Sequence, residues 1–600
     1  MRRAPTWSER GSAAVDVGDL DAARACFAEA VRAERGSAGH RYHLAVVQEA
    51  LGDFGAAAAS LTEALRLDPA MAGAARRLAL LAGRCDLPGE EPLNAAGLKA
   101  ALAHDTVDRD LIAEAALRHL GRTAPLADAL AIGRSEGWPA AARGLCLNKT
   151  AALLRDQLFQ EVLRTSVFRG RDAERLLTAL RRVLLEVAPA RLQERALFDF
   201  ALALAQQCQI NEHVWAVSAA EASAVERLAP PMDALLGGDA GAGCRLLVTA
   251  LYRPFTELLG EHVGPQQARG IRPRALREVV TCALAEAADE RARMRRMPRL
   301  GGIVEAISRE VAQQYEASPY PRWTSVGLLA PKDMRRALRR YFSDPELAFL
   351  ERRFEVLIAG CGTGQQAVQA ALAYGPQARV LAIDLSTASL AYAARMAERF
   401  GVCNISFAQA DLLTLHRAGG GSVQRFDVIE CTGVLHHLAD PLQGWRALIR
   451  CLAKDGRMLL GLYSATARRN LSALRREAAY PGAGCTDAAL RAFRQELLDR
   501  PDGAPGSELA TSRDFYATSN VRDLVLHVSE HPLTLPQVAR FLEENGLTFR
   551  GFQLERGVFG RFQERFPGEV WPGCLHSWAQ FEDANSNTFN GMYNFWCARI

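Results

Sequence analysis

A glycine-rich turn near the middle of the chain is the clearest candidate for a ligand-binding element. The apolar run Phe354–Ala359 stops at Gly360, and Gly362 and Gly364 follow at alternate positions before a helical pattern begins at Ala367. Glycine tolerates unusual backbone angles and lets a ligand approach closely, and the first turn of a helix offers free N–H groups. Strand, glycine turn and helix together are typical of the opening of a nucleotide-binding unit.

Two carboxylates follow the glycine turn at the ends of predicted strands. Asp384 ends the run 379–383 and lies 20 residues after Gly364, where a carboxylate can accept hydrogen bonds from ribose hydroxyls. Asp411 ends the next apolar run, 405–410. The pattern therefore predicts two acids at the carboxyl edge of a parallel sheet.

The turn differs from the dinucleotide-binding pattern of dehydrogenases. That pattern has glycine at its first, third and sixth positions. Here glycine falls at the fifth position, Gly364, and the sixth is Gln365. The sequence therefore disfavours a nicotinamide enzyme.

A proline-aromatic segment upstream is a candidate substrate wall. Pro319 and Pro321 stiffen the chain around Tyr315, Tyr320 and Trp323. We expect these three aromatic side chains to line the substrate pocket, with the alternative that the segment is a linker packed on the sheet.

Candidate acid–base groups lie beyond the fourth predicted strand, 426–431. They are His437, His527, Glu530 and His531. Imidazole and carboxylate groups are the usual carriers of protons in catalysis. Histidines and carboxylates can bind a metal ion, but the spacing here does not require one, and we predict no metal site.

Further apolar runs complete a sheet. Runs at 456–463, 549–554 and 593–599 have the length and composition of strands, and helical patterns separate the earlier ones. We therefore expect an α/β Rossmann-like domain of seven strands over 350–600, with an insertion at about 465–532.

These motifs, in this order, resemble the class I S-adenosylmethionine-dependent methyltransferases of bacterial type, over about residues 350–464 and the C-terminal end. The resemblance implies S-adenosylmethionine as the cofactor, with the glycines near its methionine part, Asp384 at the ribose and Asp411 with Leu412 at the adenine. The full set of cofactor-binding positions that it implies is Gly360, Cys361, Gly362, Gly364, Asp384, Leu385, Asp411, Leu412 and Val434.

The N-terminal region contains a repeat. Gly18-Asp19 recurs as Gly52-Asp53, a shift of 34 residues, and matching apolar and charged positions follow at the same shift. This resembles the tetratricopeptide repeat over about residues 5–84. The resemblance implies a concave surface for a protein or peptide segment, or a brace for the next domain.

The sequence divides into four parts. Helical repeats cover 1–85, an all-α domain of unknown role covers 93–310, a proline-aromatic connector and helix cover 311–349, and the α/β domain covers 350–600. We thus expect an all-α N-terminal half followed by the α/β half.

The composition excludes several classes of protein. The 600 residues carry a formal net charge of +4, with 49% hydrophobic and 23% charged residues, which is ordinary globular usage. The 13 cysteines are scattered without a CxxC pair. No secretory signal, membrane span or nucleic-acid-binding module is visible, so the expected location is cytoplasmic, without nucleic-acid or membrane partners.

Together these patterns predict an enzyme that moves a methyl group to an O or N nucleophile of a protein, peptide or small molecule. Two alternatives remain open: a repeat-based interaction scaffold whose cofactor fold is vestigial, and a sensor whose domain binds S-adenosylmethionine without catalysis.

Overall fold

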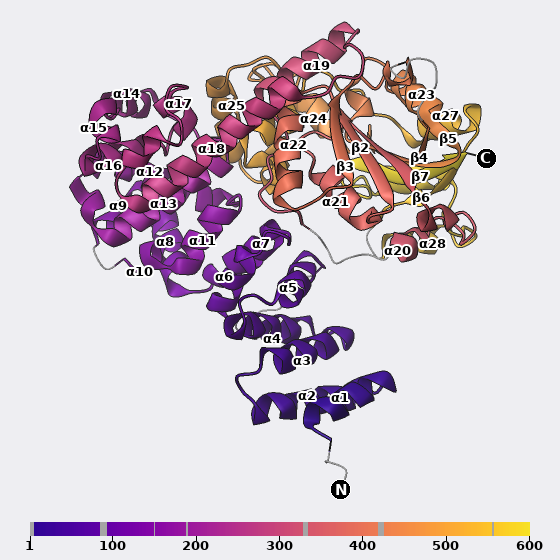
Figure 1. Ribbon diagram of the computed structural model, residues 1–600, viewed down its shortest axis with the longest axis horizontal. Coiled ribbons are helices and arrows are strands. Elements are labelled where there is room, and N and C mark those ends of the chain that lie inside the picture. The colour runs from indigo at the N-terminus through magenta and orange to yellow at the C-terminus, as the bar shows by residue number, and fades with distance from the viewer. Residues whose placement is uncertain are drawn as a thin grey trace. The chain divides into compact units, whose positions relative to one another are not determined.

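The computed structural model describes residues 5–84, 93–148, 151–187, 190–327, 334–417, 425–554 and 557–599 (Figure 1). The chain divides into two compact units. The first comprises Met1–Leu284 with Thr324–Ala330, and the second comprises Ala285–Trp323 with Pro331–Ile600. The boundary between them falls inside one long helix, α18 (Arg274–Arg296).

The repeat region forms helical hairpins, as the 34-residue shift predicts. Gly18 and Gly52 adopt φ values of 81° and 82° at the turns, and Asp19 and Asp53 directly after them each accept a hydrogen bond from a backbone N–H of the helix that follows. Equivalent residues thus perform equivalent tasks in the two repeats. The helices are α1 (Trp7–Asp16), α2 (Leu20–Ala33), α3 (Ala38–Ala50), α4 (Phe54–Leu67) and α5 (Ala72–Arg84).

The rest of the first unit is helical, which confirms the all-α expectation for the N-terminal half. Its helices are α6 (Ala95–Ala103), α7 (Arg109–Leu120), α8 (Ala124–Ser135), α9 (Trp138–Leu147), α10 (Ala152–Arg155), α11 (Gln157–Thr165), α12 (Arg171–Val187), α13 (Arg195–Ile210), α14 (Ala219–Arg227), α15 (Met232–Leu236), α16 (Ala240–Thr249), α17 (Phe255–Leu259) and the first part of α18.

A seven-stranded sheet forms the centre of the second unit, with strand order β3-β2-β1-β4-β5-β7-β6. Strands β1 to β5 are parallel, and β7 runs antiparallel to both β5 and β6. The strands are β1 (Phe354–Ala359), β2 (Ala378–Asp384), β3 (Ile405–Gln409), β4 (Phe426–Thr432), β5 (Leu452–Tyr463), β6 (Leu547–Phe552) and β7 (Met592–Arg599).

Helices cover both faces of this sheet (Figure 1). Val356 and Ile358 of β1 point into a core shared with α21 (Gln365–Tyr374) and α22 (Thr387–Arg399). Leu357 and Ala359 point the opposite way, into a core shared with α23 (Pro441–Cys451) and α27 (Leu535–Glu544). Because successive side chains of a strand alternate in direction, one apolar run fills both cores.

The insertion between β5 and α27 is mainly helical. It contains α24 (Arg469–Leu474), α25 (Asp487–Asp499) and α26 (Thr518–Leu526). The other helices of this unit are α19 (Ala306–Ala317), α20 (Met334–Leu338), α28 (Val558–Arg565) and α29 (Leu575–Ala584).

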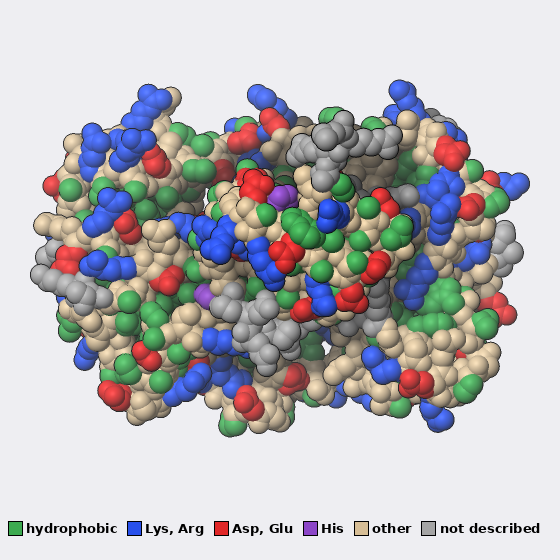
Figure 2. Space-filling model, turned by 90° about the horizontal axis from the view of Figure 1, so that it is seen from below, with side chains coloured by type: hydrophobic (Ala, Val, Ile, Leu, Met, Phe, Trp, Pro, Cys, Tyr) green, Lys and Arg blue, Asp and Glu red, His purple; other side chains and the backbone are tan. Residues whose placement is uncertain are grey.

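Charge is mixed over the surface. Basic and acidic side chains lie interspersed over the face shown in Figure 2. Among the helices of the described residues, none has both the length and the hydropathy that crossing a bilayer demands.

Candidate active site

The glycine turn lies at the carboxyl end of β1 and leads into α21. Gly360, Gly362 and Gly364 all have positive φ, at 73°, 52° and 83°. A Cβ on Gly364 would lie 2.4 Å from Cβ of Ala393, and one on Gly360 would lie 2.4 Å from Cγ2 of Val434. Backbone angle and space therefore both require glycine at these positions.

Asp384 closes β2 beside this turn. Its carboxylate accepts hydrogen bonds from the backbone N–H groups of Gly362, at 2.8 Å, and Ser386, at 2.9 Å. Burial raises the pKa of Asp384, although the backbone donors oppose that rise. The acid is thus fixed against the glycine turn, where the resemblance expects ribose hydroxyls.

Asp411 follows β3 and carries a buried oxygen without a partner. The side chain is 2% exposed, and Oδ1 accepts a hydrogen bond from the N–H of Leu413 at 3.0 Å. Oδ2 is buried and has no hydrogen-bond partner among the residues that the structure describes. Buried polar atoms are nearly always hydrogen-bonded, so this acceptor points to a donor supplied by a ligand. An adenine amino group is such a donor, and Asp411 therefore fits the expected cofactor.

The remaining predicted cofactor positions surround this edge. Cys361 and Leu412 are buried at 8% and 7% exposure, and Val434 packs against Gly360. The carbonyl of Leu385 accepts a hydrogen bond from Gln409 at 2.8 Å. Burial holds the pKa of the Cys361 thiol well above its ordinary range, so this cysteine stays protonated.

The proline-aromatic segment is bound to the glycine turn by its backbone. Carbonyl oxygens of Tyr320 and Pro321 accept hydrogen bonds from the N–H and the hydroxyl of Thr363. Trp323 is 5% exposed, donates its indole N–H to the carbonyl of Thr363 at 2.9 Å, and stacks on Phe400. Trp323 is therefore buried below the surface, where it anchors the segment.

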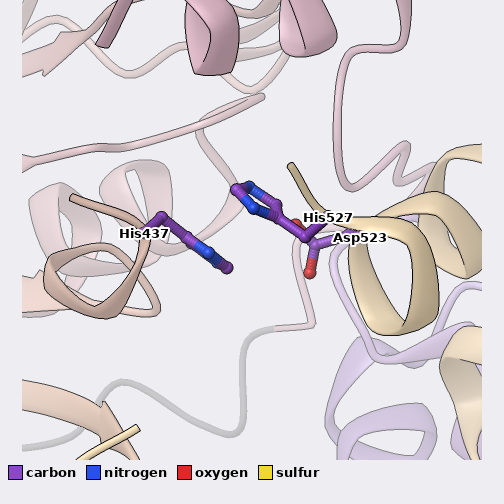
Figure 3. A group of neighbouring side chains, drawn as sticks. All are labelled: His437, Asp523 and His527. Atoms are coloured by element: carbon purple, nitrogen blue, oxygen red, sulfur yellow. The ribbon is translucent and has the colours of Figure 1, made fainter. Parts of the chain in front are cut away.

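Tyr315 and two histidines meet on the other side of the segment. The hydroxyl of Tyr315 donates to Oδ1 of Asp523 at 2.5 Å and lies 3.1 Å from Nε2 of His527. The rings of His437 and His527 stack with centroids 3.5 Å apart (Figure 3). His437 comes from the turn after β4, whereas Asp523 and His527 come from α26 and the residue that follows it.

Burial sets the protonation of this cluster. It lowers the pKa of His437 to about 3 and that of His527 to about 2, so both imidazoles are neutral at pH 7. It raises the pKa of Asp523 to about 7. One carboxyl group of the cluster is thus poised to take up a proton near neutral pH.

The other two predicted acid–base residues make no hydrogen bond with this cluster in the part of the chain that the structure describes, although the charge of Glu530 acts on Asp523. Glu530 accepts hydrogen bonds from both Arg468 and Arg475, and these ion pairs hold its pKa low against the opposing effect of burial. The side chain of His531 is exposed, and its backbone N–H donates to the carbonyl of His436 at 2.7 Å. The structure therefore brings together His437 and His527, but not Glu530 and His531.

His437, Asp523 and His527 each offer one potential metal-binding atom, and these atoms lie within 4.8 Å of one another. However, Nδ1 of His527 accepts the N–H of Ser529, and its Nε2 lies against the hydroxyl of Tyr315. Both nitrogens are occupied, so the geometry is that of a hydrogen-bonded cluster. The absence of a metal stays a prediction.

Asp523 was missing from the predicted site. One signal for it was present in the sequence: Asp523 lies four residues before His527, a spacing that places two side chains on the same helix face. Its contact with Tyr315 joins residues 208 positions apart, and spacing gives no information about such a contact.

Comparisons with known proteins agree with this geometry. A family model described as a methyltransferase domain matches residues 350–497, and one described as a tetratricopeptide repeat matches residues 41–71. An uncharacterized protein of Synechococcus is 33% identical over 218 residues, which cover 33% of this chain and 48% of that protein. The chain thus spans about half the length of the curated relative it matches.

Two solved structures were found to be similar to part of this chain. PKMT2 from Rickettsia typhi, in complex with AdoHcy, has a TM-score of 0.31 and 17% identity, covering 43% of this chain and 53% of that one. A SAM-dependent methyltransferase from Aquifex aeolicus has a TM-score of 0.22 and 14% identity, covering 45% and 99%.

The family matches and the strand order confirm two predictions. The second unit contains a class I methyltransferase domain, and the N-terminal region contains a tetratricopeptide repeat. They also confirm S-adenosylmethionine as the cofactor that this domain implies.

Proposed function

We propose that this protein transfers a methyl group from S-adenosylmethionine to an O or N nucleophile of a protein, peptide or small-molecule acceptor. The observation that carries the proposal is the unpartnered, buried oxygen of Asp411 beside a glycine turn that admits no side chain. A vestigial domain would have no reason to keep a buried acceptor open for a ligand.

The cofactor, when bound, supplies a methyl group already activated by a positive sulfur. The chain therefore needs no covalent catalyst. Its residues have to hold the cofactor, align the acceptor, exclude water and take up a proton. Gly360, Gly362 and Gly364 leave room for the methionine part, Asp384 binds the ribose, and Asp411 binds the adenine. The cluster of His437 and Asp523 receives the acceptor and its proton.

The repeats provide a surface for a protein or peptide segment in this proposal. Stacked helical hairpins form concave surfaces that bind extended segments. Their family match supports an interaction role, and the methyl acceptor is one candidate for the bound segment.

Titration calorimetry with S-adenosylmethionine tests the proposal. We expect the wild-type chain to bind and Asp384→Ala to bind at least about 100-fold more weakly, because it loses charged hydrogen bonds to the ribose. Asp455→Ala removes an exposed acid near the start of β5 and serves as the matched control. Equal affinity of the Asp384 variant and the wild type would refute the assignment.

Labelled cofactor then separates an enzyme from a scaffold or sensor. An extract incubated with the protein and methyl-labelled S-adenosylmethionine should yield labelled acceptor. Binding without any transfer would favour the sensor, and neither binding nor transfer would favour the scaffold.

A further inference from the structure

Two acceptor atoms in the cluster have no donor. Nδ1 of His437 lies 2.8 Å from the carbonyl oxygen of Ser529, which can only accept, so Nδ1 carries the proton of this neutral ring. The lone pair of His437 is therefore on Nε2. Within the part of the chain that the structure describes, no hydrogen bond joins a donor to this nitrogen or to Oδ2 of Asp523.

The neighbouring residues fix the direction of the hydrogen bonds. Nδ1 of His527 accepts the N–H of Ser529 at 3.1 Å, so the proton of His527 is on Nε2. Nε2 then donates to the hydroxyl of Tyr315, and that hydroxyl donates to Oδ1 of Asp523. The donors of His527 and Tyr315 are both used in this series of hydrogen bonds. Neither is left for Oδ2 of Asp523 or Nε2 of His437.

Both residues that carry the open acceptors are buried. His437 is 4% exposed and Asp523 is 5% exposed, so bulk water does not solvate either group freely. The atoms that these residues offer lie within 4.8 Å of each other. A buried acceptor without a donor costs about 1–3 kcal/mol, which favours a ligand that brings donors to both.

We propose that the methyl acceptor is an amine that donates one N–H to Nε2 of His437 and another to Oδ2 of Asp523. This inference rests on the proposed methyl transfer. A hydroxyl group has a single hydrogen and can satisfy only one of the two acceptors, whereas a primary amine or ammonium group satisfies both. A metal ion would instead require His527 to give up its hydrogen bond with either Ser529 or Tyr315.

The proton balance of this arrangement is complete. The ammonium form of the acceptor gives one proton to Oδ2 of Asp523, which frees the nitrogen lone pair. The nitrogen then bonds to the methyl carbon as the carbon–sulfur bond breaks, and sulfur keeps the electron pair of that bond. The products are a methylated ammonium group, S-adenosylhomocysteine and a protonated Asp523, which returns its proton to water.

The environment of Asp523 supports its role as proton acceptor. Its raised pKa of about 7 lies near neutral pH, where a base is most effective. The titratable and charged groups around it are Tyr315, Tyr320, Tyr463, Asp514, Arg468, Glu530, His437 and His527. Tyr315 is a positioning residue, because its hydroxyl bond to Oδ1 leaves Oδ2 to face the ligand.

The test uses full-length protein, S-adenosylmethionine with a ¹³C-methyl group, and cell extract as the source of acceptors. Carbon–proton NMR of the products distinguishes methyl groups on nitrogen from those on oxygen, carbon or sulfur. We expect signals from N-methyl groups. Methyl groups on any other atom would overturn the inference, whereas no labelled product from a preparation that binds the cofactor would refute the proposed function on which it rests.

Variants of Asp523 test whether methyl transfer depends on the cluster. Asp523→Asn should lower transfer at least about 100-fold, since it removes the proton acceptor, while calorimetry gives an unchanged cofactor affinity. Asp455→Asn, the same change at an exposed site, should transfer normally. Full transfer by Asp523→Asn would contradict the inference. Failure of the wild type to bind S-adenosylmethionine would instead refute the proposed function.

Tyr315→Phe separates positioning from a merely structural role. Without its hydroxyl, Asp523 loses a hydrogen bond that lowers its pKa, so the acid limb of the pH–rate profile should move to higher pH. We expect kcat to fall about tenfold, in line with the loss of one hydrogen bond to a charged group. An unmoved profile would remove Tyr315 from this role.

Dialysis against a chelator addresses the competing metal interpretation. Transfer should persist after dialysis. Loss of transfer that a single added metal ion restores would show that His437, Asp523 and His527 bind that ion, and would overturn the amine interpretation.

Discussion

The cofactor side and the acceptor side of the site are built in different ways. Gly364, Asp384 and Asp411 each follow a parallel strand, and consecutive strands place them at one edge of the sheet. On the acceptor side, Tyr315 and Asp523 are separated by 208 residues and meet only because the insertion packs against α19, the helix that carries Tyr315. In the proposed function, the cofactor side therefore depends on short-range chain geometry, and the acceptor side on long-range packing.

The largest expected loss of stability comes from a substitution of Glu530, which lies on the acceptor side. Its carboxylate is 2% exposed and pairs with Arg468 and Arg475. Glu530→Gln leaves the buried guanidinium group of Arg468 and the partly buried one of Arg475 without their counter-charge. It should lower the free energy of unfolding by about 3 kcal/mol. Urea denaturation measures this change.

An exposed pair in the same insertion provides the control. Glu496 is 49% exposed and pairs with Arg500. Glu496→Gln should change stability by less than about 1 kcal/mol. Equal effects of the two substitutions would show that burial of the Glu530 pairs has no special weight.

On the cofactor side, the strongest structural change is Gly364→Ala. The new Cβ would lie 2.4 Å from Cβ of Ala393 at a φ of 83°, so steric overlap adds to backbone strain. We expect the free energy of unfolding, measured by thermal denaturation, to fall by about 2–3 kcal/mol. Gly375 has a φ of 75° with open space around it, and Gly375→Ala should cost only about 1 kcal/mol. Similar losses in both variants would contradict the close packing at Gly364.

The pH dependence of stability tests the acceptor side. Folding raises the pKa of Asp523 from 3.8 to about 7, so the folded state binds the extra proton between these values and stability falls as the pH rises through this range. Asp523→Asn removes this loss. Relative to wild type, the free energy of unfolding of the variant should therefore rise by about 2–3 kcal/mol between pH 5 and pH 8. Thermal unfolding at both values provides the measurement, and a constant difference would refute the shifted pKa.

The smallest expected effect belongs to Asp411. Asp411→Asn removes the charge of a buried, unpartnered oxygen. Cofactor affinity should fall about tenfold, since one charge-assisted hydrogen bond is weakened, while the stability of the ligand-free chain should not fall. A drop in stability without a change in affinity would mean that Asp411 has a structural role only.

The sequence predicted the strands and the glycine turn of the cofactor side well because their signals are local. The alternation of apolar runs and helical patterns predicted the strands of the sheet, and each predicted acid lies at a strand end. The glycines at positions 360, 362 and 364 all adopt the left-handed angles for which glycine is used. Such features depend on a few neighbouring residues, so spacing reveals them.

The acceptor side was predicted less well. Nothing in the sequence distinguished the four predicted acid–base residues, which are His437, His527, Glu530 and His531. The structure places Glu530 in ion pairs and leaves His531 exposed. Trp323 was expected in the substrate wall, yet it anchors the segment from below through Thr363. Asp523, which now carries the central proposal, was not predicted as a site residue.

The sequence alone determined that the chain has helical repeats at one end and a class I methyltransferase sheet at the other. Periodicity and turn chemistry act over a few residues, and a printed sequence contains them in full. The tertiary structure alone decided which side chains surround the acceptor. It set which nitrogen of His437 is open and which oxygen of Asp523 is unpartnered, because both follow from contacts between distant segments. Burial by those same contacts shifts the pKa values that the proposed chemistry uses.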